Sequence, residues 1–257
     1  MNKLWIALLP VTLLAQERIT ATFSDPNRPG TVRISAVEGS ITVTGAPGKD
    51  VIVESSRGSR ERDRDAQSGM RRIITAGGGI EVQEEGNVMK INMDHGRGGN
   101  LIVQVPTKTT LVVKAVNRGV TIENVEGEVD ASSVNGNVIV KNITGSIIAN
   151  SHNGKIEASL NAATPDKPMS FITMNGNVDV TLPATTKANL RMRAENGDVF
   201  SDFDVTLRGD QTQTKTDVQG DRRRWRSDSF TLGTINGGGP EIRLESMNGK
   251  IYVRKKQ

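Results

Sequence analysis

The chain has 257 residues, with 33 basic against 29 acidic side chains, no cysteine, and an aromatic content of only 3%. The lack of cysteine excludes a disulfide framework and a thiolate metal site, and the small positive net charge supports no more than weak attraction to anionic polymers. Because aromatic residues usually give a globular core its bulk and 27 residues here are glycine, the composition favours a thin core of Val, Ile, Leu and Ala.

Residues 1–15 are typical of a secretory signal peptide. Lys3 precedes an apolar run from Leu4 to Leu14, which is too short to span a bilayer. Leu13 occupies the place where a small residue is preferred before a cleavage site, so a buried N-terminal strand is the alternative. We expect residues 16–257 to form one exported domain without a transmembrane segment, located in the periplasm, on the cell surface or outside the cell.

Between residues 20 and 53, short strand patterns alternate with Pro and Gly, and Ile41 and Val43 are expected to point inward. The pattern stops in residues 55–72, where charges of both signs alternate and almost nothing is apolar. Such a segment cannot bury enough surface to offset its ordering entropy, so we expect a mobile, solvated insertion, with polyanion binding as the alternative. The strand pattern resumes in residues 84–94 through Met89, Ile91 and Met93.

A longer motif occurs twice, in residues 101–119 and 178–197. In each copy a strand runs into a proline, Pro106 or Pro183, which is followed by a Thr/Lys-rich corner and a second strand that ends at Asn and Gly. Because proline lacks the N–H group that a strand ladder needs, it marks the end of a strand.

The stretch from Asn117 to Leu160 repeats one short pattern almost without a gap. Each unit of about nine residues begins near a glycine, and aliphatic residues or alanine recur two and four positions later, as in Val138 and Val140. This is the alternation of a half-buried strand that follows a turn. The expected structural turn glycines, including three further along the chain, are Gly119, Gly127, Gly136, Gly145, Gly154, Gly176, Gly197 and Gly249.

One such unit cannot bury its apolar edge, whereas stacked copies form a continuous narrow core. We therefore predict an all-β, single-stranded β-solenoid of the parallel β-helix type, with coils of about 18 to 22 residues and two charged loop insertions. A meander of hairpins is the alternative, because Asn-Gly is also a hairpin signal. The constant period, and the inward corner positions expected for Val134 and Ile143, favour the solenoid. We also expect positive φ at the corner glycines and stacking of the corner asparagines.

A second insertion is predicted at residues 208–229, where Trp225 stands among four arginines. This cluster could bind a polyanion by charge and stacking, or fold back on the solenoid. Strands are expected again around Ile242 and Ile251. The closing basic residues, 254–256, are expected to blunt an exposed strand edge. The candidate polyanion-binding residues are Arg222, Arg223, Arg224, Trp225 and Arg226.

No catalytic motif, metal-ligand spacing, cofactor-binding loop or specific nucleic-acid motif occurs in the sequence. The two histidines, His95 and His152, have no second ligand at metal spacing, and His152 is expected to be a corner residue. One enzymatic alternative is a polysaccharide-cleaving site made of carboxylates on adjacent coils. The acids that stacking could bring together are Asp130, Glu157, Asp179, Asp198, Asp202 and Asp204.

The recurrence of Asn-Gly before alternating apolar residues, at Asn135, Asn153, Asn175, Asn196 and Asn248, resembles the bacterial DUF4097 family of β-strand-repeat proteins and the related head domain of autotransporter adhesins. The Leu-Pro corner, the signal peptide and the scarcity of aromatics are similar as well. The resemblance implies a β-helix exposed to the envelope or the outside, an inferred role in adhesion, and no catalytic residues. We therefore expect a noncatalytic structural or adhesin-like protein of the bacterial envelope, without a cofactor, whose partner is an envelope polymer or another protein.

Overall fold

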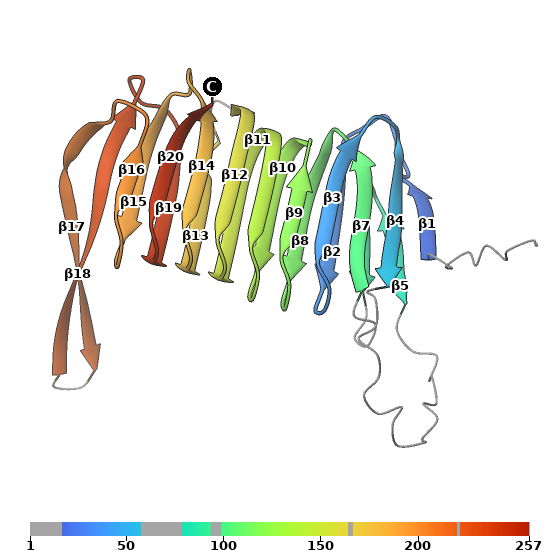
Figure 1. Ribbon diagram of the computed structural model, residues 1–257, viewed down its shortest axis with the longest axis horizontal. Helices are drawn as coiled ribbons and strands as arrows, with labels where there is room; N and C mark the ends of the chain where they lie inside the picture. Colours follow the sequence, from blue (N-terminus) through green and yellow to red (C-terminus); the bar gives the residue numbers. More distant parts are fainter. Residues whose placement is uncertain (1–16, 58–78, 94–98, 164–166, 220–221, 257) are drawn as a thin grey trace, which may run out of the picture.

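The chain forms a rod of stacked β-strands (Figure 1). The computed structural model describes residues 17–57, 79–93, 99–163, 167–219 and 222–256, and strands make up all of the regular structure within these ranges. The proposed signal peptide, His95, and most of the insertion at 55–72 lie outside the described residues. Among the residues described, there is no helix that is long and apolar enough to cross a membrane.

The strands form one continuous sheet that wraps into two faces around a narrow core. Face 1 contains, in spatial order, β5 (Ile80–Glu85), β6 (Val88–Met93), β2 (Gly30–Ala36), β8 (Thr109–Ala115), β10 (Glu126–Ser133), the second half of β11 (Val138–Asn153), β13 (Met169–Asn175), β19 (Glu241–Asn248), β15 (Ala188–Ala194), β18 (Arg222–Ile235) and β17 (Thr206–Gln219). Face 2 contains β1 (Glu17–Thr22), β4 (Asp50–Arg57), β7 (Gly99–Pro106), β3 (Ile41–Ala46), β9 (Val120–Glu123), the first half of β11, β12 (Ile156–Ala163), β14 (Val178–Pro183), β20 (Ile251–Lys256) and β16 (Val199–Ser201).

One coil consists of one strand from each face, so the nine-residue unit of the sequence is half a coil. Val120, Val138 and Ile156 lie side by side on parallel strands and are 18 positions apart in sequence. The next step, from Ile156 to Val178, is 22 positions. The all-β solenoid and its coil length are therefore confirmed.

The core consists of the inward residues of both faces, which alternate with outward residues along each strand. Ile41, Val43, Met89 and Ile91 are fully buried, as the strand alternation predicts. The inward rows contain mostly aliphatic residues and alanine, together with a few larger side chains such as the fully buried Phe171. The core is therefore largely aliphatic, as the composition predicts.

The order of coils along the rod differs from their order in the chain at both ends. The coil of β2 and β3 lies between that of β6 and β7 and that of β8 and β9. In the same way, the last coil, β19 and β20, lies between β13–β14 and β15–β16. Each terminal coil is therefore hydrogen-bonded on both sides.

The two proline corners mark the places where the chain passes over an inserted coil. Pro106 ends β7, and the chain crosses the end of β3 before it begins β8, with the Thr107 amide donating to the Ala46 carbonyl at 3.1 Å. Pro183 ends β14 beside Lys256 of β20, and the chain then continues to β15. The motif that the sequence repeats at this longer scale thus corresponds to the two crossovers.

Three local expectations need correction. β20 is not the last strand of face 2, because it pairs with β14 and, over Ile251–Val253, also with β16, so the closing basic residues flank the outermost strand and do not form it. The second insertion has regular structure, since residues 208–229 belong largely to the antiparallel hairpin of β17 and β18. Val134 was expected to point inward, but its side chain is 44% exposed, whereas Ile143 is buried.

Candidate functional site

A four-residue corner recurs at one edge of the rod, where each strand of face 1 passes to face 2. It consists of a buried hydroxyl residue, an outward residue, an asparagine and a glycine. We call it the asparagine corner. Its four complete copies are residues 133–136, 151–154, 173–176 and 246–249, with a related copy, in which Ala and Glu come first, at 194–197.

The glycine of the asparagine corner is required by the close approach of neighbouring coils. A Cβ atom built on Gly136 would lie less than 3.0 Å from backbone atoms of Arg118 and Gly119. The same holds at Gly154, Gly176, Gly197 and Gly249, where the obstructing backbone belongs to the adjacent corner glycine. The expected positive φ occurs in this group only at Gly176, with φ 154°, so the physical reason given from sequence was wrong for the other four.

The remaining predicted turn glycines also lie against neighbouring backbone. A Cβ atom at Gly119, Gly127 or Gly145 would come within 3.0 Å of Asn137, Thr109 or Gly127 respectively. Gly145 has φ 148°. These glycines belong to two different corners of the coil, which explains why they recur at half the coil length.

The corner asparagines form a hydrogen-bonded ladder along the rod. The Nδ2 atoms of Asn153, Asn175, Asn248 and Asn196 donate to the Oδ1 atoms of Asn135, Asn153, Asn175 and Asn248, at 2.9, 2.7, 2.7 and 2.8 Å respectively. Each inner amide therefore donates to one neighbour and accepts from the other. The predicted stacking of asparagines is confirmed. The ladder continues without a break through Asn248 of the inserted last coil.

The buried hydroxyl residues join each corner to the next coil from the inside. Ser133, Ser151, Thr173 and Ser246 donate to the carbonyl oxygens of Arg118, Gly136, Gly154 and Gly176 at 2.8 to 3.0 Å. These bonds satisfy hydroxyl groups that would otherwise be costly to bury. The corner is thus held by an amide ladder outside and hydroxyl bonds inside.

The outward residues of the asparagine corner form a row that is apolar except for His152. In register along the rod they are Val116, Val134, His152, Met174 and Met247. Val134 is 44% exposed, and Met174 and Met247 are each 37% exposed, whereas the inward aliphatic residues of the same strands are buried. His152 is a corner residue, as the sequence predicts, and its side chain is exposed.

A shallow groove of about 450 Å³ lies beside this row, and we call it the corner groove. Its middle is lined by uncharged residues, among them Ser132, Asn150 and Ile172, together with this row. Charged side chains line it only toward one end, where Arg193 pairs with Glu195 and Glu245 lies nearby. The middle of the groove can therefore accept an elongated ligand through largely apolar contacts, with His152 as the titratable side chain among them.

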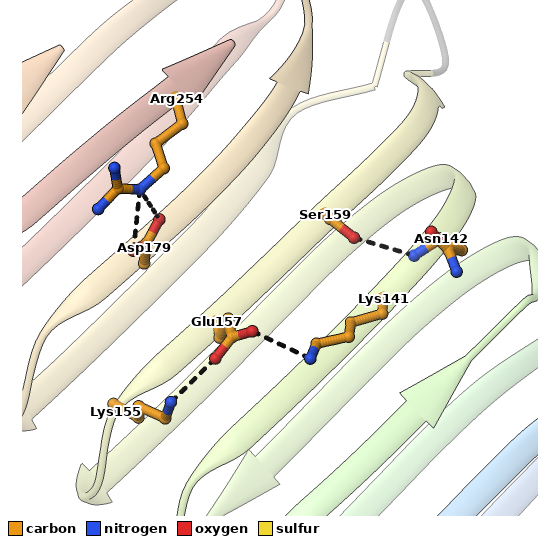
Figure 2. Close-up of polar contacts among 7 residues, drawn as sticks. All are labelled: Lys141, Asn142, Lys155, Glu157, Ser159, Asp179 and Arg254. Carbon is orange, nitrogen blue, oxygen red and sulfur yellow. Dashed lines mark hydrogen bonds and ion pairs between the residues drawn. The ribbon is translucent and has the colours of Figure 1, made fainter. Parts of the chain in front are cut away.

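The acids considered for a polysaccharide-cleaving site do not converge in the corner groove. Glu157 and Asp179 are neighbours on face 2, but Asp130 lies on face 1 and none of the six candidates lines the groove. Figure 2 shows that Glu157 binds Lys155 and Lys141, at 2.9 and 3.1 Å, while Asp179 binds Arg254 at 2.9 Å.

These ion pairs favour the charged forms of Glu157 and Arg254. The hydrogen bond from Lys155, supported by Lys141, lowers the pKa of the Glu157 carboxyl, and Asp179 raises the pKa of the Arg254 guanidinium. A general acid needs a raised carboxyl pKa, so Glu157 has the opposite tuning. Over the described ranges, no group of three or more His, Asp or Glu side chains could hold a metal ion.

The arginine cluster lies on the hairpin that extends from one end of the rod. Residues 222–226 begin β18 and pair with Gln219 to Lys215 of β17. The side chains of this part of the hairpin lie outside the description, so polyanion binding by Arg222, Arg223, Arg224, Trp225 and Arg226 stays a prediction. The sequence pattern does not distinguish this hairpin from an irregular loop, because its strands contain few apolar residues.

Solved structures that are similar to this chain match it at low identity. A "putative cell adhesion protein" from Clostridium sporogenes is 10% identical, with 94% of this chain and 100% of that chain covered and a TM-score of 0.46. A "putative adhesin" from Bacteroides fragilis is 13% identical, with 95% and 98% covered and a TM-score of 0.39. No curated protein matches the sequence.

The family is established by the sequence itself. The profile of the family described as Toastrack DUF4097 matches residues 22–251, which include the asparagine corners and the inserted coil of β2 and β3. The resemblance inferred from the Asn-Gly recurrence is confirmed, and the chain belongs to the Toastrack DUF4097 family.

Proposed function

We propose that the protein is a noncatalytic, exported β-solenoid with an adhesin-like role at the bacterial cell envelope, and that the corner groove is its contact surface. The observation that carries this proposal is the row of half-exposed Val and Met side chains that recurs, with His152 at its centre, from coil to coil at the asparagine corner. Contiguous exposed apolar side chains mark interaction sites more often than isolated ones do.

The corner groove is suited to binding because its shape is fixed before a ligand arrives. The asparagine ladder and the buried hydroxyl bonds hold successive corners in register. A surface that is already ordered loses little conformational entropy on binding. Two methionines on the rim, Met174 and Met247, can adapt to partners of different shape.

Export and the envelope location rest on the apolar run of residues 4–14, which is followed by a chain without cysteine. The ligand class that the groove favours is an elongated envelope polymer or protein segment with little charge. The separation of Asp130 from Glu157 and Asp179 gives no support to the polysaccharide-cleaving alternative.

The proposal is tested by binding with matched variants. Beads coated with the purified chain are sedimented with insoluble peptidoglycan sacculi and, separately, with intact bacterial envelopes. We expect Val134→Gln combined with Met174→Gln to reduce bound beads at least about fivefold, because the loss of apolar contact area weakens binding. The control is Ile102→Gln, which changes a side chain of similar exposure, 40%, on face 2.

Equal binding by the groove variant and the control would exclude the corner groove as the contact surface. Release of reducing sugar from the sacculi by wild-type protein would overturn the noncatalytic assignment. Melting temperatures of both variants should stay close to that of the wild type, since the changed side chains point outward.

A further inference from the structure

The two ends of the rod are finished in opposite ways (Figure 1). Beyond the coil of β15 and β16, face 1 continues with β18 and β17, whereas face 2 stops at β16. Beyond the coil of β6 and β7, face 2 continues with β4 and β1, whereas face 1 continues only with β5. Each end thus extends further on one face, and the longer face differs between the two ends.

The end formed by β16 and β17 leaves core positions uncovered. Val199 is in register with Ile251 and Val178, which are fully buried, yet Val199 is 36% exposed. Leu207 is aligned with Gly233 and Leu190, both buried, yet it is 65% exposed. Both residues hold inward positions of the last layer, so the core is open here.

The main chain of β16 is open as well. The Ile251 amide donates to the Asp198 carbonyl at 2.9 Å, and the Asp202 amide donates to the Val253 carbonyl at 3.0 Å. Because the direction of main-chain groups alternates along a strand, those of Val199 and Ser201 point away from β20. In the part of the chain that the structure describes, β16 pairs with β20 alone. A free edge of this kind is a template for another strand.

The two ends also differ in charge. β5 contains three glutamates, Glu81, Glu84 and Glu85, and no basic residue. The sequence of β17, the edge strand of the other end, contains two basic and two acidic residues. Around β16, Asp198, Asp202 and Asp204 are accompanied by the basic residues of β20. The acidic β5 therefore meets no excess of negative charge in the sequence of β17.

From these observations we infer that the protein assembles head to tail, with the β16–β17 end of one copy receiving the β1–β5 end of a second copy. On face 1, β17 and the incoming β5 run antiparallel, and on face 2, β16 and the incoming β1 run parallel, so both can form ladders. The incoming β1 and β4 extend on the face where β16 stops short, and they would cover Val199 and Leu207.

Such a contact joins two different surfaces and does not close on itself, so it produces filaments. Rods joined in this way would present their corner grooves in a repeating array. The inference does not depend on ligand binding by the groove, and either proposal can fail while the other stands.

The experiment is sedimentation velocity of the full chain over a wide range of concentration. We expect the mean mass of the wild type to rise with concentration. Leu207→Lys combined with Phe200→Lys places two charges at the open end, and Glu81→Arg combined with Glu85→Arg reverses the charge of the other end. Each double variant should weaken association by about tenfold or more, because a charge would have to be buried without a partner.

Ile148→Lys is the matched control, because Ile148 has the same exposure as Phe200, 45%, but lies on face 1 away from both ends. It should associate like the wild type. Mixing the two double variants is the decisive step, since each keeps one intact end. Head-to-tail contact predicts that the mixture forms dimers and that no oligomer larger than the dimer appears.

Three results would overturn the inference. One is a wild-type mass that stays monomeric at every concentration. Another is a loss of association in only one of the two double variants, which would indicate a symmetric contact. The third is equal weakening by Ile148→Lys. Thermal melting of every variant shows whether a loss of association is caused by misfolding. Because Phe200 stacks on Tyr252, the single variant Leu207→Lys replaces the double variant if loss of this stacking lowers the melting temperature.

Discussion

The middle of the rod and its two ends use the same strands and corners, but they are connected differently. From β8 to β14 each coil stacks on the one that precedes it in the chain. At the ends, the first and last coils are inserted between two others. The corner therefore sets the geometry of a coil, while the order of coils is set by the crossovers at Pro106 and Pro183.

The largest effect should come from removal of the inserted strand β20. A chain that ends at Gly249 loses the buried side chains of Ile251 and Val253, removes one of the two neighbours of β14, and leaves β16 without its only neighbour among the described strands. Burial of two such side chains contributes about 3 to 6 kcal/mol. We expect the truncated chain to melt far below the wild type or to lose its β-sheet circular dichroism.

Removal of β1 is the control, because β1 also has six residues but pairs only with β4 among the described strands. The chain without residues 1–22 should lose much less stability. If both truncations lower the melting temperature equally, β20 is no more than a terminal strand, and the interleaved order is wrong.

A second large effect is expected at a corner in the middle of the rod. In Gly136→Ala the new Cβ atom would lie less than 3.0 Å from backbone atoms of Arg118 and Gly119, so adjacent coils must separate. Overpacking of this kind costs about 1 to 3 kcal/mol. Thermal melting should show a clear decrease, and Gly136→Val, with a larger side chain, should show a greater one.

The matched control is Gly86→Asn, in the turn between β5 and β6. Gly86 has φ 59° and open space around its Cα, and Asn tolerates this left-handed conformation. Its melting temperature should change little. Similar losses in Gly136→Ala and Gly86→Asn would show that the spacing between coils tolerates a Cβ atom.

The inward rows and the asparagine ladder could be predicted from sequence because both depend on local repetition. Val138 and Ile156 occupy equivalent places in successive coils, and the alternation around them identifies the inward side. Val134 could not be placed correctly, because the nine-residue unit averages two different corners of one coil. One corner points Ile143 inward, and the other points Val134 outward.

The insertion of the terminal coils could not be predicted, since main-chain hydrogen bonds carry no information about which strand is the partner. β3 pairs with β7 and β9 through the same backbone groups that any neighbouring strand would use. The apolar corner groove did leave a signal in the sequence. An apolar residue precedes Asn-Gly at Val134, Met174 and Met247, at positions where a solvent-exposed turn would favour polar residues.

A smaller difference between middle and end should appear in the asparagine ladder. Asn175 donates to Asn153 and accepts from Asn248, whereas Asn196 makes only a donor bond to Asn248 in the ladder as described. A net hydrogen bond contributes about 1 kcal/mol. Asn175→Ala should therefore cost roughly twice as much as Asn196→Ala, measured as the free energy of unfolding in urea. A larger cost for Asn196→Ala would show that the amides act independently of their ladder.

The smallest expected effect concerns the ion pairs on face 2 in the middle of the rod. Lys155 and Lys141 lower the pKa of Glu157 below 4.5, its ordinary value, so the folded state releases this proton more readily than the unfolded state. The resulting stability is present above pH 4.5 and is lost as the pH falls through the lowered pKa. Because the three side chains are 34 to 50% exposed, the gain should stay below about 1 kcal/mol. Urea unfolding should show Glu157→Gln slightly less stable than the wild type at neutral pH, with the difference closing in acid and shrinking with added salt. In a double-mutant cycle, Glu157→Gln should change the free energy of unfolding much less in the Lys155→Gln background than in the wild type. A stability difference between Glu157→Gln and the wild type that widened in acid would mean that the carboxylate is not stabilised by these lysines.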